Sequence, residues 1–350
     1  MFSLPRAFHS MTEMNTPYSE RSCQRPATWA LVLGFACVYT SWGTTYLAIR
    51  VGVDKEKLPP ALFGGTRVCL AGLILLGFLA ARGERLALSK QDWARILWTS
   101  LLLFVVGNGL VTLAMQTVPS GVTAVLVAST PLWIGLFEMF WPGGDRLTVR
   151  GWVGMIVGLA GVFVLLAPKL GDPAAFWGNA GPLLVLLSAC SWALGSLVMR
   201  HRRLSCPHLT GAAYQMILGG GCLALLGVAI GELKNLPPRV TEGAVFSFLY
   251  LLIVGSLVGF VSFNWLLGHV PAAKVGTYAY VNPVVAVFVG WLLADEEIGI
   301  PLIASIAVIL TGVALVRSGE RPGLPDEETI PVVPPNELPV PENEAAYPSR

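Results

Sequence analysis

Two prolines lie inside apolar stretches of the chain, and polar side chains come directly before each of them. Pro131 follows Ser129 and Thr130, and Pro283 follows Asn282. Because proline has no N–H, it leaves a backbone carbonyl one turn earlier without its helical hydrogen-bond partner. Carbonyls freed in this way, beside hydroxyl and amide groups, can bind a polar ligand. The two positions therefore predict helix breaks at Pro131 and Pro283, next to a ligand site.

Four further polar residues lie within apolar runs. Arg67 is about six residues, or ~9 Å, into its run, where a charge costs a few kcal/mol unless it reaches water or a partner. It either attracts an anionic group of a ligand or holds helices together. Asn108 and Asn264 either bond across helices or face a wet cavity. Glu138 is a candidate for proton coupling, and a solvated surface carboxylate is the alternative.

Composition determines the elements that must position these residues. Hydrophobic residues make up 54% of the chain and charged residues 13%, which is far from the usual composition of a soluble protein. Apolar runs of about 20 residues match bilayer crossings. Because lipid leaves backbone polar groups unpaired, the crossings must be helices, so we expect an all-α integral membrane protein with the lipid bilayer around it. Ten spans are predicted, near 28–49, 59–81, 93–116, 120–141, 151–167, 177–199, 208–231, 243–268, 272–294 and 298–317.

The chain repeats itself. Pro119 and Pro131 recur as Pro271 and Pro283 at one offset (271−119 = 283−131 = 152), and Ser41-Trp42 recurs 150 residues on (191−41). Each half is then a five-helix unit, at 28–167 and 177–317. An odd number of crossings brings the second unit in from the opposite side, which predicts two inverted repeats.

The two ends fall outside the bundle. Residues 1–27 form a polar N-terminal segment, and residues 318–350 are rich in Pro and Glu and predict a disordered tail. The loops that would share a side with the N-terminus hold most of the Lys and Arg residues. The positive-inside rule therefore places both termini in the cytoplasm.

An enzyme is disfavoured. The four histidines, His9, His201, His208 and His269, fall at ends and in loops, and no HExxH, GxSxG or Walker sequence occurs. We expect no catalytic residue, no metal, no cofactor and no nucleic-acid partner. Without a nucleotide-binding loop, any transport would be secondary, driven by a gradient or by substrate concentration.

Several motifs in order carry a resemblance to a known family. They are SWGTTYLAIR in the first span, PPALFGGTR opening the second, VGNG in the third, VPSGVTAVLVASTPLW leading into the fourth, and VPAAKVGTYAYVNPVVAVFVGWLLADEEI in the ninth. In this order the chain resembles the EamA-domain family of the drug/metabolite transporter superfamily, over residues 30 to 317. The resemblance implies a ten-helix carrier of two inverted repeats that moves small metabolites or drug-like compounds, usually outward, across a bacterial inner membrane.

The resemblance also implies where the substrate binds. The third, fourth, eighth and ninth spans would line a central cavity, with the first and sixth helping to gate it. Candidate substrate-binding residues are Arg67, Asn108, Thr130, Asn264, Tyr278, Tyr280 and Asn282, with Trp42, Tyr46, Trp192 and Trp265 as aromatic walls. For the aromatic residues, packing or anchoring at the membrane interface is the alternative.

We therefore predict a secondary exporter of a small-molecule substrate that works by alternating access. A channel or facilitative pore is the alternative, and a membrane-embedded enzyme is less favoured. The sequence does not determine the substrate, the coupling ion, the direction of net transport or the oligomeric state.

Overall fold

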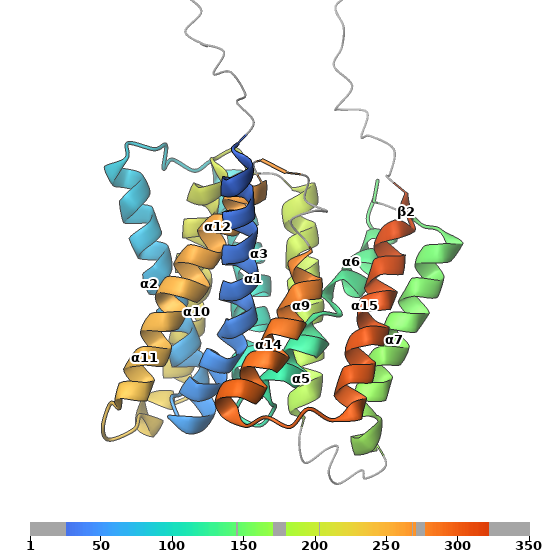
Figure 1. Cartoon of the computed structure of the whole chain (residues 1–350). Helices are drawn as coiled ribbons and strands as arrows, with labels where there is room; N and C mark the ends of the chain where they lie inside the picture. Colours follow the sequence, from blue (N-terminus) through green and yellow to red (C-terminus); the bar gives the residue numbers. More distant parts are fainter. Residues whose placement is uncertain are drawn as a thin grey trace, which may run out of the picture.

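The computed structural model describes residues 26–144, 146–170, 180–202, 204–267, 269–270 and 277–321, which form a bundle of helices (Figure 1). The first half contains α1 (Thr28–Arg50), η1 (Val51–Lys55), α2 (Pro60–Ala81), α3 (Lys90–Ser100), η2 (Leu101–Asn108), α4 (Gly109–Ala114), α5 (Ser120–Val127), α6 (Thr130–Glu138), β1 (Arg146–Leu147) and α7 (Val149–Leu170). The second half contains α9 (Gly181–His201), α10 (His208–Ala229), η3 (Glu232–Asn235), α11 (Glu242–Tyr250), η4 (Leu251–Val258), α12 (Gly259–Leu267), α14 (Tyr278–Ala294), α15 (Ile300–Ser318) and β2 (Glu320–Arg321).

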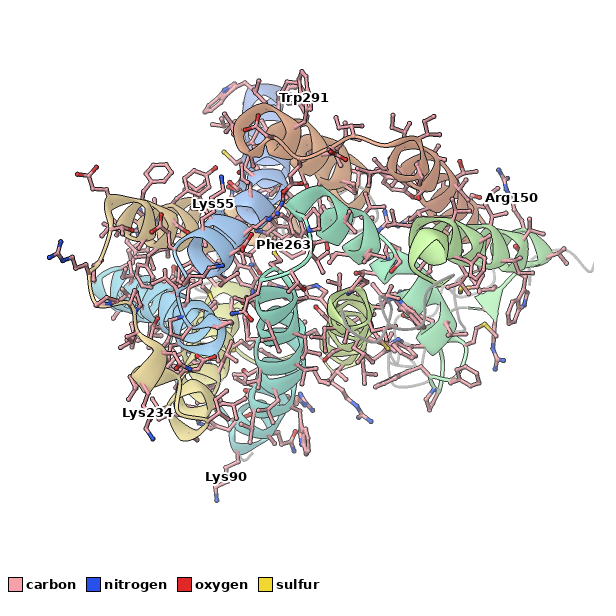
Figure 2. The ribbon with its side chains drawn as sticks, turned by 90° about the horizontal axis from the view of Figure 1, so that it is seen from below. Lys55, Lys90, Arg150, Lys234, Phe263 and Trp291 are labelled. Atoms are coloured by element: carbon pink, nitrogen blue, oxygen red, sulfur yellow. The ribbon has the colours of Figure 1, made fainter. Side chains whose placement is uncertain are left out.

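The bundle has the length and surface of a membrane protein. In the described part of the chain, 8 helices are long and apolar enough to cross a bilayer, and Val149–Leu165 and Tyr278–Ala294 are shorter apolar helices. Large apolar side chains point outward, among them Ile300 at 83% exposure and Trp291 at 51%, and Trp291 lies at the edge of the bundle seen from below (Figure 2). The all-α membrane class is confirmed, and the count of ten spans stays a prediction.

Small residues allow the closest helix pairs to form. α2 packs along α10, and α7 along α15. A Cβ atom added to Gly65 would lie 2.3 Å from the backbone nitrogen of Ala224, and one on Gly312 would lie 2.3 Å from that of Gly158. At both contacts, only a glycine lets the two backbones approach this closely.

The remaining contacts also link the two halves in matching pairs. α1, the first helix of its half, packs on α14, α12 and η4. α9, the first helix of the other half, packs on α6, α4 and η2. If the two halves exchange places, one set of contacts becomes the other. Contacts of this kind are expected when two repeats are related by a two-fold axis.

Four of the described spans depart from a regular α-helix. The first span ends in the π-helical segment η1, Val51–Lys55. The third and eighth spans contain π-helical segments, Leu101–Asn108 and Leu251–Val258, 150 residues apart (251−101). The fourth span is interrupted between α5 and α6, directly before Pro131. The second predicted break is wrong, because α14 runs from Tyr278 to Ala294 straight through Pro283.

A short strand pair lies at the end of the bundle where α15 finishes. β2, in the segment predicted as a disordered tail from 318, pairs antiparallel with β1, and Arg146 lies opposite Arg321. Residues 1–25 and 322–350, which carry the rest of the predictions for the two ends, lie outside the described residues. α1 begins and α15 ends on the same side of the bundle (Figure 1).

Candidate functional site

A cavity of about 200 Å³ lies between the two halves, with its wall drawn from both. Arg67 is at its polar side, and the helix ends on either side of the fourth-span interruption contribute Val127 and Thr130. The remaining lining residues include Trp42, Thr45, Tyr46, Ile49, Phe104, Asn108, Ala128, Pro131, Ser188, Trp192, Ser256, Phe260, Tyr278, Ala279, Asn282, Pro283 and Arg317. The cavity therefore brings together most of the residues that the sequence selected.

Arg67 is held between the π-helical segments of the third and eighth spans. Its Nη1 donates to Ser256 Oγ at 3.2 Å, and its Nη2 donates to Asn108 Oδ1 at 3.2 Å. The side chain is only 4% exposed, and its Nε has no hydrogen-bond partner. Both partners are neutral, so the charge is oriented by these bonds and not neutralised by them.

The two prolines free different groups. The carbonyl of Val127, one turn before Pro131, accepts a hydrogen bond from Thr130 Oγ1 at 2.6 Å. The carbonyl of Ala279, one turn before Pro283, loses its helical donor because proline has no N–H, and Ala279 lines the cavity. Next to it, Asn282 is 5% exposed and its Oδ1 has no partner.

Aromatic rings form the apolar wall. The Trp42 ring meets the edge of Tyr278 at a centroid distance of 4.9 Å, and its Nε1 donates to the carbonyl of Gly255 at 3.2 Å. Trp192 packs against Phe104 at 6.3 Å. Rings fixed in this way can hold a flat apolar body between them.

Four predicted residues do not line this cavity. Asn264 donates to the carbonyl of Phe260 at 2.8 Å, within its own helix. Trp265 packs on His269 at 4.3 Å, and Tyr280 contacts the guanidinium of Arg317 at 5.8 Å. Glu138 is 2% exposed, so the expectation of a solvated surface carboxylate is wrong.

Sequence reasoning did not select Thr45, Ser188, Ser256 or Arg317, although all four line the cavity. Ser188 donates to the carbonyl of Gly107, inside the π-helical segment, at 2.6 Å. For Thr45, Ser188 and Ser256 the only sequence signal was a hydroxyl group within an apolar run, and for Arg317 it was a charge at the end of one. The π-helical segments that bring Asn108 and Ser256 to Arg67 had no recognisable signature.

An ion pair lies at the end of the bundle where α1 finishes. Arg50 Nη1 donates to Glu296 Oε1 at 2.5 Å, and Glu296 also accepts from the N–H groups of Ser120 and Gly121, at 2.9 and 3.0 Å. Burial raises the pKa of Glu296, but the bonds from Gly121, Ser120 and Arg50 outweigh it and hold the pKa below its usual value. We call this contact the Arg50–Glu296 closure.

A second ion pair lies at the opposite end, where α9 finishes (Figure 1). Arg200 Nη1 is 2.8 Å from Glu138 Oε1, and His201 Nε2 is 2.9 Å from Glu138 Oε2. Arg50 and Arg200 are 150 residues apart (200−50), the same offset as the repeated Ser-Trp pair. We call this contact the Arg200–Glu138 closure.

A second hollow has no such chemistry. It is an apolar groove of about 460 Å³ between α2 and α11, and it is lined by residues such as Leu62, Phe63, Leu236 and Phe248. Thr66 is the only polar side chain among its described lining residues. In a bilayer, such a groove is suited to a hydrocarbon chain and not to a polar substrate.

The fold and the cavity together define an all-α membrane protein with a cavity between its two halves. The EamA-like transporter family matches residues 28–167 and again residues 179–318, so the chain belongs to this family. Each half of the bundle is thus one copy of the family's repeat.

Curated relatives agree with this assignment. The chain is 35% identical over 286 residues to the uncharacterized inner membrane transporter YedA of Escherichia coli (strain K12), covering 81% of this chain and 89% of YedA. It is 28% identical to the uncharacterized transporter YvbV of Bacillus subtilis (strain 168), covering 83% and 92%. It is 25% identical to an S-adenosylmethionine/S-adenosylhomocysteine transporter of Chlamydia muridarum, covering 83% and 96%.

A solved structure shares the fold. It superposes with a TM-score of 0.59 at 22% identity and covers 82% of this chain and 97% of its own.

Proposed function

We propose that this chain is a secondary carrier that exports a small molecule across a bacterial inner membrane by alternating access. The cavity between the two repeats is the substrate site, and both termini are cytoplasmic. The end with the Arg50–Glu296 closure then faces outward, and the end with the Arg200–Glu138 closure faces the cytoplasm. The two five-helix repeats have inverted topology in this proposal.

The observation that carries the proposal is the pair of closures. Each joins the last turn of a repeat's first helix to the end of a helix from the other repeat's cavity wall: α1 to the residues after α14, and α9 to α6. Two equivalent contacts at opposite ends of one cavity can exchange roles, so that one opens while the other stays closed. A carrier with inverted repeats requires this exchange.

The interruption of the fourth span supplies a place where the wall can bend. α5 and α6 are separate helices, and Glu296 binds the N-terminus of α5 whereas Glu138 ends α6. A change at one closure therefore acts on one half of this broken helix. Hinges of this kind absorb backbone changes at helix ends.

Counterflow in liposomes tests the proposal. Liposomes with purified protein are loaded with an unlabelled solute, and uptake of the same labelled solute at trace concentration is followed. A carrier accumulates the label transiently above equilibrium, and its flux saturates with solute concentration. A channel, the alternative function, brings the label only to equilibrium, and such behaviour across a broad panel of solutes would refute the carrier.

A further inference from the structure

The charges on the cavity wall are of one sign. Arg67 and Arg317 line the cavity, and none of its described lining residues is Asp or Glu. Arg317 packs over the Tyr280 ring. Arg67 is only 4% exposed, and its two hydrogen-bond partners, Ser256 and Asn108, are neutral. A buried guanidinium without a counter-charge is costly in a membrane, and an anion that binds there removes that cost.

A second, independent feature lies on the same wall. Asn282 Oδ1 is buried and accepts no hydrogen bond, and Ala279, beside it, has a carbonyl without its helical donor. Both groups are acceptors. A ligand that fits them must offer an N–H or O–H group at a position away from its negative charge.

The size and walls of the cavity limit the ligand further. An apolar cavity of about 150 Å³ holds one benzene molecule, so the 200 Å³ here holds a body of one ring and a small charged group. Trp42, Tyr278, Trp192 and Phe104 provide apolar walls for such a body. Of the two guanidiniums on the wall, Arg317 already packs over the Tyr280 ring, so the ligand charge is matched to Arg67. A single guanidinium suits a monoanion better than a phosphate, which carries about −1.5 to −2 charges at pH 7.

We infer that the transported substrate is a small organic carboxylate with a separate hydrogen-bond donor: its carboxylate binds Arg67, its donor binds Asn282 Oδ1, and its apolar body lies between the aromatic rings. This inference rests on the proposed function, since it names the substrate class of the same site. Arg67 then has two roles, because Ser256 and Asn108 accept from two of its five N–H groups and leave the Nε–H and one N–H on each Nη for the ligand.

Binding of five matched probes to the purified full chain tests the inference. The probes, measured by titration calorimetry, are 4-hydroxybenzoate, benzoate, 4-hydroxybenzamide and phenyl phosphate, with 3-hydroxybenzoate as a second position for the donor. A hydroxybenzoate should bind most tightly. The neutral amide should lose at least ~10-fold in affinity, and benzoate should bind about 5- to 150-fold more weakly, since an unpaired buried acceptor costs about 1–3 kcal/mol.

Two variants separate the contacts. Arg67→Lys retains the charge but not the planar fork, so it should weaken both carboxylates and leave the amide unchanged. Asn282→Ala should remove most of the difference between the hydroxybenzoate and benzoate while benzoate itself binds as before. Melting temperatures of both variants are measured beside the wild type, and only a folded variant is compared.

Equal affinities for 4-hydroxybenzamide and 4-hydroxybenzoate would overturn the inference. Tighter binding of phenyl phosphate than of the hydroxybenzoates would also overturn it, as would no binding of either hydroxybenzoate. Counterflow distinguishes these results from failure of the proposed function. If neutral or cationic solutes show counterflow while the carboxylates do not, the substrate class is wrong and the carrier stands. If no solute of any charge shows counterflow, the carrier itself is wrong.

Discussion

Replacing Glu296 with glutamine should open the cavity on the side that we assign to the exterior. The substitution keeps the shape of the side chain but removes its charge from the bonds with Arg50 and the N–H of Gly121. Hydrogen bonds to a charged group contribute about 1.5–3 kcal/mol and neutral ones about 0.5–1.5 kcal/mol. The one amide oxygen of glutamine can still accept from Arg50 and Ser120, but its NH2 group cannot accept from Gly121. Loss of the Gly121 bond and weakening of the Arg50 bond, whose side chain is 25% exposed, together give about 2 kcal/mol.

This free energy predicts the size of the effect. At 1.4 kcal/mol per factor of ten, about 2 kcal/mol raises the population of the outward-open state about 30-fold. The reporter is Thr45→Cys, which lines the cavity, in a background without the six native cysteines. Its reaction rate with a membrane-impermeant maleimide, added outside the cell, should rise by that factor in Glu296→Gln.

Glu297→Gln is the matched control, because Glu297 is the exposed neighbour of Glu296 in the same turn. It should leave the labelling rate unchanged. Equal rates in Glu296→Gln and the wild type would refute the role of this closure, as would an equal rise in the control.

Three further predictions concern stability and pH. Because the pKa of Glu296 lies below its usual value, its contribution to the closure is present above the ordinary carboxyl range and is lost only as the pH falls through the lowered pKa. Maleimide reacts with the thiolate, so the labelling rate of Thr45→Cys is divided at each pH by that of a cysteine at the exposed position 297. This ratio should stay constant from pH 7.5 to about 5, and a rise with a midpoint within that range would contradict the assignment. Glu232 accepts from the N–H groups of Ala61 and Leu62 at the start of α2, so Glu232→Ala should lower the free energy of unfolding by about 1 kcal/mol in a denaturant titration, whereas Glu84→Ala, at an exposed residue, should not. Gly65→Ala should destabilise the α2–α10 contact by about 1–3 kcal/mol. Gly77→Ala is the control, since nothing lies within 4 Å of its added Cβ, and it should leave the melting temperature unchanged or higher. Equal melting temperatures for the two variants would contradict the prediction and show that the helices can shift apart at no cost.

The class of fold was predictable because hydrophobic runs and repeated prolines can be recognised in the sequence alone. The family match at two repeats confirms what Pro119, Pro131 and the repeated Ser-Trp pair indicated. Helix continuity at Pro283 was not predictable, since a proline removes one hydrogen bond and its neighbours decide whether the helix bends or stays intact.

The cavity was predictable in outline and the closures were not. Arg67, Asn108 and Asn282 stand out as polar residues in apolar runs, so composition alone selects them. The partners of Glu138 and Glu296 come from chain segments more than 60 and 240 residues away (200−138 = 62; 296−50 = 246). No local pattern reports such contacts, so the sequence offered Glu138 only as a proton-coupling candidate or a surface carboxylate and did not select Glu296.

The central claim is that one cavity opens to one side at a time, and the most direct test is two-sided labelling of a single cysteine in it. Ala128→Cys, between α5 and α6, is labelled in right-side-out and inside-out vesicles, in the wild type and with Glu296→Gln or Arg200→Gln. The proposal predicts opposite changes: Glu296→Gln raises the rate from outside and lowers it from inside, and Arg200→Gln does the reverse. Rates that rise together on both sides would describe a pore and contradict alternating access.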